Sequence, residues 1–300
     1  MTAGTRMTEE TAMERGLRKL PAAIADLTSL DRLAEPLAGA ASRLTRPRPL
    51  KDLLTGTWLG HPLHPVLTDV TIGAWTSAWL LDLVPGERAE EVADAFIGLG
   101  ILSALPTAAT GVSDWAETHG EDRRIGLAHG AGNVAALLAY VGSLAARRRG
   151  RRGLGVALSW AGIGIATFTA YLGGHLVYAK GVGVDRNVQP GLPTAWRQAL
   201  DASELPDGVP TLARVDGAGV LLYRTGDRIL AVGDRCSHRG CSLARGQIRD
   251  EGGEPVVECR CHGSTFRLTD GSVVHGPATS PQPAMEARLQ DGKVTVRLVP

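Results

Sequence analysis

The chain has 300 residues, of which 44% are hydrophobic, and its 32 Lys and Arg residues nearly balance its 31 Asp and Glu residues. This length allows two domains, and the balanced charge argues against a nucleic-acid-binding protein. Apolar residues are concentrated in 66–179, whereas 1–60 and 180–300 carry most of the charge. The distribution predicts a membrane segment between two water-exposed segments.

Residues 1–58 are expected to form a polar N-terminal arm. Leucines and one isoleucine recur between Leu17 and Leu37 at steps of three or four, the spacing of one helix face. Pro21 and Pro36 interrupt this pattern. The arm therefore forms either short helices that lie on the membrane surface or a partly disordered tail. No cleavable signal-peptide pattern is visible.

Residues 59–180 are predicted to form an α-helical transmembrane bundle with four spans. A helix needs roughly 20 apolar residues to cross a bilayer, and four runs are candidates: 66–84, 95–113, 125–146 and 153–179. Asp69 and Asp82 make the first run the weakest of the four. We still predict that it spans, because a lone soluble helix beside three spans would leave Trp75 and Trp79 without partners.

A weak internal repeat is present in this region. Gly98-Leu-Gly-Ile recurs as Gly162-Ile-Gly-Ile, and His64 recurs as His129. Either a duplicated two-helix hairpin or chance in a glycine-rich stretch explains it.

Residues 181–205, rich in glycine and proline, are expected to be a linker. The apolar pattern then changes to that of short strands, with Asp-Gly turn signals between some of them. Six strands are predicted, at 220–223, 229–232, 256–258, 265–268, 272–275 and 294–299. Residues 206–300 therefore form a small all-β domain.

All four cysteines lie in two short stretches, CSHRGC at 236–241 and CRCHGS at 259–264, each with one histidine. Thiolates and imidazoles bind zinc and iron. Three interpretations remain open at this point: a structural zinc site, two disulfides, or a [2Fe–2S] centre held by two Cys and two His. Zinc sites more often use Cys-x2-Cys pairs, and two disulfides would leave both histidines unexplained.

The stretches CSHRGCSL and CRCHGSTF resemble the two cluster-binding boxes of Rieske proteins. The resemblance implies that Cys236 and Cys259 bind one iron of a [2Fe–2S] cluster, and that His238 and His262 bind the other.

The respiratory and photosynthetic branch of this family has one more cysteine in each box, and the two form a disulfide. Cys241 and Cys261 occupy these positions. Gly276 and Pro277 resemble the start of the proline loop that covers the cluster in these proteins.

Two further positions bear on the reduction potential. Ser264 resembles the family serine that donates to a bridging sulfide, whereas Phe266 stands where high-potential members have a tyrosine. Without that hydroxyl, we expect a potential in the middle of the range of about −150 to +300 mV for such centres. Such a potential speaks against quinol oxidation.

The GHPLHP stretch at 60–65 resembles the start of an uncharacterised family of four-helix membrane proteins, over about residues 58–180. If the helices alternate in direction, one membrane face collects six ionisable residues: His61, His64, Asp69, Asp114, His129 and His175. Such groups are costly at membrane depth and often functional. They could bind haem b, another metal or a quinone, or form a hydrogen-bonded network between helix ends. His119 and His275 are expected in loops without a special role.

These features predict an integral membrane electron-transfer protein of bacterial type, in contact with membrane lipid. It would carry single electrons between a membrane-side donor, quinol or cytochrome, and a partner protein or quinone, as a carrier or oxidoreductase subunit rather than a self-contained enzyme. The alternatives are a tethered ferredoxin-like reductant for a separate oxygenase, and a redox sensor switched by the disulfide. The disulfide that the resemblance implies favours an external β domain, although the positive charges are split between both faces.

Overall fold

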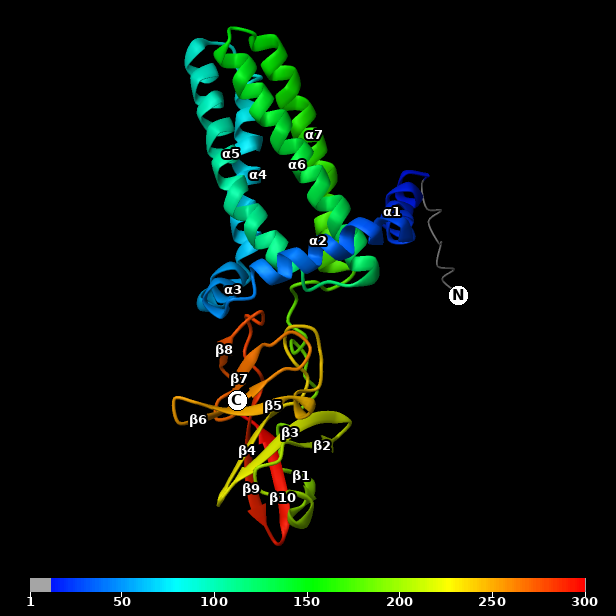
Figure 1. Ribbon diagram of the computed structural model, residues 1–300, viewed down its shortest axis with the longest axis vertical. Coiled ribbons are helices and arrows are strands. Elements are labelled where there is room, and N and C mark those ends of the chain that lie inside the picture. Colours follow the sequence, from blue (N-terminus) through cyan, green and yellow to red (C-terminus); the bar gives the residue numbers. More distant parts are fainter. Residues whose placement is uncertain (1–11, 300) are drawn as a thin grey trace, which may run out of the picture. The chain divides into compact units, whose positions relative to one another are not determined.

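The computed structural model describes residues 12–299 (Figure 1). It divides into two compact units, which are described separately here. The first holds most of the helices, and the second holds all the strands together with residues 41–69 and 106–117. The helices are α1 Ala12–Ala25, α2 Asp31–Leu44, α3 Arg48–Thr55, α4 Leu63–Leu81, α5 Glu87–Trp115, α6 Gly120–Arg148 and α7 Arg152–Tyr178.

Three helices within the described part of the chain are long and apolar enough to cross a membrane: α5, α6 and α7. Helix α4 has 19 residues but is not among them. The prediction of four spans is therefore wrong by one in its count. The physical reason is that His64, Asp69 and several threonine and tryptophan residues lower the hydropathy of α4.

Helices α4 to α7 share one apolar core, in which Trp75 of α4 and Tyr140 of α6 are stacked. Their ring centroids are 4.2 Å apart and their planes differ by 13°. Each ring lies against a glycine of the next helix, since a Cβ added at Gly100 would lie 2.2 Å from Trp75 Nε1 and one at Gly162 would lie 2.8 Å from the Tyr140 ring. Both glycines are required because the rings occupy the space of a side chain.

The same local contacts occur twice along the chain, once in α4–α5 and once in α6–α7. Trp75 in α4 corresponds to Tyr140 in α6, 65 residues later. The glycine that each ring contacts, Gly100 in α5, corresponds to Gly162 in α7, 62 residues later. With the same two spacings, His64 corresponds to His129 and Gly111 corresponds to Gly173. In both pairs the histidine ring would collide with a Cβ on the glycine. This agreement favours duplication over chance, and it pairs Gly162 with Gly100 instead of Gly98.

An ion-pair network closes the α4–α5 turn and the α6–α7 turn at one end of the first unit. The side chains of Arg147 and Asp82 are 1% and 0% exposed and are paired. Arg147 Nη1 also lies 2.9 Å from Asp94 Oδ1, and Arg152 contacts both carboxylates. A buried arginine needs such partners, because an uncompensated buried charge is strongly destabilising.

The β domain consists of two antiparallel sheets (Figure 1). The six-stranded sheet has the order β1-β10-β9-β4-β3-β2, and the four-stranded sheet has the order β5-β6-β7-β8. The strands are β1 Arg197–Asp201, β2 Thr211–Val215, β3 Ala218–Thr225, β4 Arg228–Gly233, β5 Gln247–Glu251, β6 Glu254–Glu258, β7 Thr265–Arg267, β8 Val273–His275, β9 Ala284–Gln290 and β10 Lys293–Leu298.

Strand β3 is buried on both faces and separates two apolar cores. Val220 and Leu222 belong to the core within the six-stranded sheet. Leu221, on the opposite face, belongs to the core that also contains Cys236 and Cys259. The second core therefore lies directly beneath the two cysteine-containing stretches.

All six predicted strands are present, and four strands were missed: β1, β2, β5 and β9. Strand β1 lies inside the segment 181–205 that was expected to be a linker, and it pairs with β10. Strand β5 has the sequence QIRDE, whose single apolar residue gives no alternating pattern. These strands form because their neighbours supply hydrogen-bond partners, which local composition does not show.

Candidate metal centre

Two six-residue loops with the same backbone closure carry all the cysteines. In the loop after β4, Cys236 N donates to Cys241 O at 2.8 Å, and Gly240 N donates to Cys236 O at 2.8 Å. The loop after β6 repeats both bonds, from Cys259 N to Ser264 O at 2.8 Å and from Gly263 N to Cys259 O at 2.9 Å. The fifth residue of each loop has φ near +80°, which favours glycine.

Cys236 and Cys259 begin the two loops and are buried without a disulfide. The Cys236 thiol donates a hydrogen bond to Cys259, which lowers the pKa of Cys259 and raises that of Cys236. Two sulfur atoms thus meet at one point, and one of them is readily deprotonated. The thiolate is the form that binds a metal.

His238 and His262 lie in the same two loops, with ring centroids 5.0 Å apart and nearly perpendicular planes. His238 Nδ1 is buried and has no hydrogen-bond partner. Such an orphaned polar atom requires an explanation, and a bound metal ion is one. Burial also lowers the pKa of His238 to about 3, which keeps the ring neutral, the form that binds metals.

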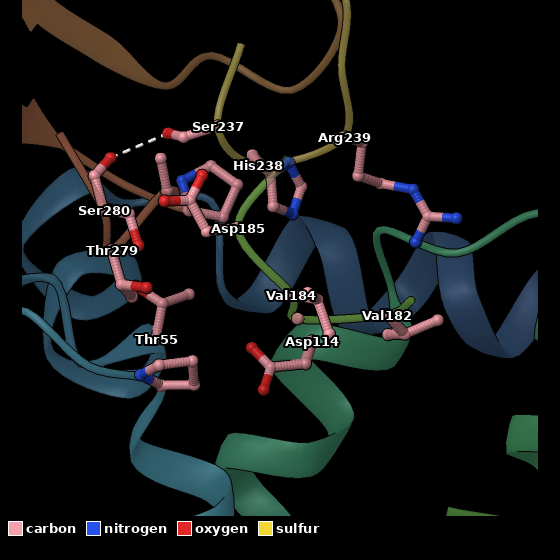
Figure 2. A pocket seen from close by; sticks show the side chains of 14 residues that line it. Thr55, Asp114, Val182, Val184, Asp185, Ser237, His238, Arg239, Thr279 and Ser280 are labelled. Carbon is pink, nitrogen blue, oxygen red and sulfur yellow. Dashed lines mark hydrogen bonds between the residues drawn. The ribbon is translucent and has the colours of Figure 1, made fainter. Parts of the chain in front are cut away.

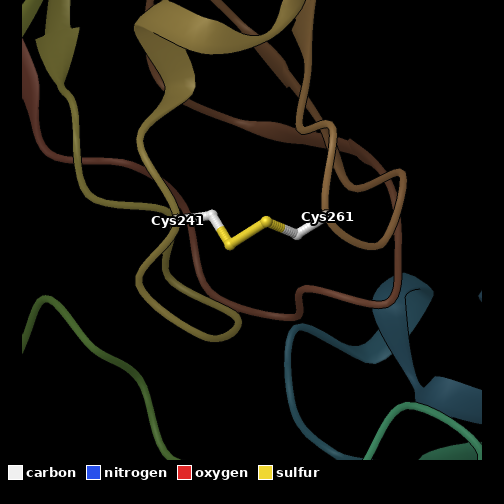
Figure 3. Close-up of a disulfide and its surroundings, with 2 residues drawn as sticks. All are labelled: Cys241 and Cys261. Atoms are coloured by element: carbon white, nitrogen blue, oxygen red, sulfur yellow. A yellow bond between two sulfur atoms is a disulfide. The ribbon is translucent and has the colours of Figure 1, made fainter.

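The expected disulfide between Cys241 and Cys261 is present, with an S–S distance of 2.05 Å (Figure 3). Within residues 12–299, one group of three His, Cys or acidic side chains has ligand atoms within 4.8 Å of one another, namely Cys241, Cys259 and Cys261. The disulfide occupies two of these sulfur atoms. The group therefore shows where the sulfur atoms converge, but it is not itself a set of metal ligands.

The proline loop after β8 lies beside the second cysteine loop. Ala278 N donates to Ser264 Oγ at 3.0 Å, so the Ser264 hydroxyl keeps its own proton for another acceptor. Pro277 follows a cis peptide bond and is buried. Phe266 is fully buried in the core that contains Cys236 and Cys259.

Residues from the N-terminal arm hold the proline loop, which the sequence did not suggest. Asp52 of α3 accepts from Gly276 N at 2.7 Å and lies 2.7 Å from His275 Nδ1. Thr57 donates to Ala278 O at 3.2 Å. All these residues belong to the second unit. Some 220 residues separate the partners, and no local motif marks them.

The expectation that His275 lies in a loop is wrong, because it is the last residue of β8. Its Nε2 lies 2.9 Å from Glu251 Oε1, so the ring lies between two carboxylates, Asp52 and Glu251. Carboxylates only accept hydrogen bonds, so only the doubly protonated ring can make both contacts fully.

Helix α3 is also fastened to the end of α5. Lys51 Nζ lies 2.5 Å from Glu117 Oε1 and donates to Ser113 O at 3.2 Å. Lys51 is only 8% exposed. Helix α3 therefore contacts the end of a membrane-capable helix through Lys51 and the proline loop through Asp52.

A small cavity of about 40 Å³ adjoins His238 (Figure 2). Asp114, at the end of α5, and Pro277, of the proline loop, also line it, and every lining residue belongs to the second unit. A cavity of this size holds a few water molecules.

The six ionisable residues of the predicted membrane face have different surroundings. His61 is exposed, with Nδ1 2.9 Å from Pro62 O, and His64 Nδ1 lies 2.9 Å from Thr107 O. His129 uses both ring nitrogens: Nδ1 lies 2.7 Å from Thr169 O, and Nε2 lies 3.0 Å from Asn133 Nδ2.

Thr169 also donates to Asn133 Oδ1 at 2.6 Å. His129 is thus part of a hydrogen-bonded network between α6 and α7, one of the interpretations left open above. Asp69 lies in α4, Asp114 lies near the end of α5, and His175 lies in the last turn of α7.

The comparisons with known proteins agree with this geometry. The family model of the Rieske [2Fe-2S] domain matches residues 195–293. Ferredoxin CarAc of Metapseudomonas resinovorans is 31% identical over 102 residues, which are 34% of this chain and 92% of the ferredoxin. The chain belongs to the Rieske [2Fe–2S] family. Its Rieske domain implies a [2Fe–2S] cluster, and this finding favours that interpretation over zinc or disulfides alone.

Other comparisons concern both halves of this Rieske protein. The ferredoxin subunit of 3-phenylpropionate/cinnamic acid dioxygenase from Escherichia coli K12 is 30% identical over 101 residues, 33% of this chain and 91% of the subunit. The solved ferredoxin of carbazole 1,9a-dioxygenase from Nocardioides aromaticivorans is 27% identical, with a TM-score of 0.32, covering 34% of this chain and 97% of that one. Residues 60–186 match a family described as predicted membrane protein (DUF2231). The protein is therefore a membrane protein that transfers electrons through a Rieske cluster.

Proposed function

We propose that this protein is a membrane-anchored carrier that passes single electrons from a membrane-side donor to a partner protein, with Cys236 and Cys259 holding one iron and His238 and His262 the other. The observation that carries the ligand assignment is the convergence of two buried sulfur atoms and two histidine rings, one of which has an orphaned Nδ1. When bound, the cluster supplies one-electron redox chemistry.

The chain's own residues have three roles in this proposal. The thiolates and neutral imidazoles hold the irons, and the imidazoles make the centre easier to reduce than an all-cysteine cluster. Ser264 accepts from Ala278 N, so its hydroxyl proton would remain available to a bound cluster. Pro277 and Phe266 keep water away from the cluster, since both are buried.

Electron entry at the membrane surface is supported by the contacts of α3. Lys51 joins this helix to the end of α5, and Asp52 joins it to the proline loop. The loop beside the proposed ligands is thereby held near the end of a helix that can cross the membrane. A donor in the membrane, quinol or cytochrome, would reach the centre there.

A second candidate is a tethered reductant for a separate oxygenase. One matched relative is named as a ferredoxin and another as the ferredoxin subunit of a dioxygenase. Phe266, without a hydroxyl, agrees with the lower potential that such a role uses. In that case the donor would be a reductase in place of a quinol.

The ligand assignment is tested with His262→Ala in the full-length protein. We expect loss of the Rieske electron paramagnetic resonance signal and of about half or more of the bound iron. His61→Ala, which changes an exposed histidine, is the matched control and should keep both. An unchanged signal in His262→Ala would refute the assignment.

The donor is tested separately, in vesicles that contain the purified protein. Rapid reduction of the cluster by a short-chain quinol supports the membrane donor. Reduction by a flavoprotein reductase with NADH, without any by quinol, supports the oxygenase-linked role instead. Neither result depends on which residues bind the irons.

A further inference from the structure

Helix α2 buries its small residues and exposes its large apolar ones. Ala34 and Ala38 are 0% and 1% exposed, whereas Leu33 and Leu37 are 61% and 52% exposed. In a helix that packs between a protein core and water, the leucines would be buried and the alanines exposed. The reversed arrangement indicates that the leucine face meets an apolar medium outside the protein.

Two acidic side chains of α2 form ion pairs with arginines of helix α6. Asp31 Oδ1 lies 2.8 Å from Arg124 Nε, and Glu35 Oε2 lies 2.5 Å from Arg123 Nη1. Both arginines belong to the first turns of α6. Arg124 also donates to Ala25 O, at the end of α1. Two acidic side chains of α2 therefore fasten this helix to the start of α6.

These ion pairs determine the depth of α2 in the membrane. Residues 121–124 of α6 read Glu-Asp-Arg-Arg, and the next 22 residues, 125–146, carry no charge. In a helix that crosses the bilayer, such a charged turn lies at the boundary between the hydrocarbon and water. Helix α2 is held at this boundary, and it runs across α6 rather than along it (Figure 1).

We infer that α2 is an interfacial helix whose face of Leu33 and Leu37 inserts into the bilayer surface. A helix at this depth that lies across the bundle presents one side to the lipid, and the leucines are on the exposed side. Exposed Arg32, next to Leu33 but on another side of the helix, would reach the lipid headgroups. The partner of this face is therefore the lipid itself, and this inference does not depend on the proposed ligands or donor.

The test uses spin labels in the full-length protein reconstituted in lipid nanodiscs. Single cysteines replace Leu33, Leu37 and Arg32 in turn, and the unsubstituted protein measures labelling of the native cysteines. Collision with oxygen, which dissolves in lipid, is compared with collision with a water-soluble nickel chelate. We expect the oxygen-to-nickel ratio to be several-fold higher at Leu33→Cys and Leu37→Cys than at Arg32→Cys.

Two results would overturn the inference. Equal nickel accessibility at all three positions would place the leucine face in water. Protection of both leucine positions from both reagents would show that protein covers this face, either a second copy or another partner. The Rieske spectrum of each variant shows that the protein is folded.

Discussion

Phe266 and the residues around it show how one side chain can set the potential of the centre. The ring is 0% exposed and shares a core with Cys236 and Cys259. It has no hydrogen to donate to a thiolate, and a donor there would stabilise the more negative, reduced state. The missing hydroxyl is therefore expected to lower the midpoint potential.

Phe266→Tyr should raise this potential by tens of millivolts. A differential stabilisation of about 1.4 kcal/mol corresponds to roughly 60 mV for a one-electron couple. Redox titration of the cluster signal measures the shift. Phe266→Leu, which adds no donor, is the control, and an unchanged potential in Phe266→Tyr with an intact cluster would mean that the hydroxyl does not reach sulfur.

At the scale of single residues, the sequence predicted the site residues that lie within short motifs and missed the contacts between residues far apart in the chain. Within each loop the two cysteines and the histidine lie one to five positions apart, so their spacing indicates a common site. Asp52 and His275 are 223 residues apart and meet only because the folded chain brings α3 to the proline loop. No sequence signal could have joined them.

Asp52→Asn should loosen the proline loop without unfolding the β domain. It removes the charge from an acceptor that binds both Gly276 N and His275. Hydrogen bonds to charged groups contribute about 1.5–3 kcal/mol, so exchange of the Gly276 amide should accelerate roughly tenfold or more. Hydrogen exchange with mass spectrometry measures this.

The matched control is Asp207→Asn, because Asp207 also accepts from a glycine amide, Gly226 N, at 2.9 Å. It should leave exchange in the proline loop unchanged. Equal exchange in Asp52→Asn and the unsubstituted protein would show that α3 does not restrain the loop.

A buried ion-pair network around Arg147 connects the helices at one end of the first unit. The Arg147 side chain contacts Asp82, which directly follows α4, and Asp94 of α5. The network stabilises the fold by compensating buried charge, because removal of one partner leaves the other charge buried and unpaired. The four helices depend on it at this end of the bundle.

Arg147→Met should therefore destabilise the first unit by about 3–5 kcal/mol. In detergent, this corresponds to a fall in the thermal midpoint on the order of 10 °C. The double variant Arg147→Met with Asp82→Asn should recover part of the loss, because it no longer buries a lone carboxylate. A double variant less stable than the single one would contradict this account.

The long helices were predictable because their uncharged runs are as long as a membrane is thick. Their ends were not, since α5 begins at Glu87, eight residues before its uncharged run, in a charged turn that composition assigns to water. The N-terminal arm is helical from Ala12 to Leu44 with one interruption, which decides against the disordered alternative for these residues. The beginning of the arm, residues 1–11, lies outside the described residues.

For the whole molecule, the order of the parts could be predicted: an arm, a helical membrane domain and an all-β domain. The exact boundaries 1–58, 59–180, 181–205 and 206–300 remain a prediction, although β1 shows that strand structure begins by Arg197. The connection between arm and proline loop could not be foreseen, because it belongs to the folded chain rather than to either part.

If the membrane half is a duplicated hairpin, the chain should tolerate a break between its two halves. Residues 1–118 and 119–300, produced together as separate chains, should purify as one complex with the Rieske spectrum. Tagged 119–300 produced alone, the control, should be degraded or aggregate, because Tyr140 and Arg147 would lack their partners Trp75 and Asp82. A stable, monomeric 119–300 would contradict this expectation.

The pairing of Asp82 with Arg147 also bears on the history of the protein. The two residues are 65 apart, the same shift that relates Trp75 to Tyr140, so they occupy equivalent places in the two hairpins. An ancestral hairpin that paired with a copy of itself would have placed like charges together at this point. With opposite charges at equivalent places, each half complements the other at this point. If the two hairpins arose by duplication, divergence at this one position would have replaced self-association by complementarity.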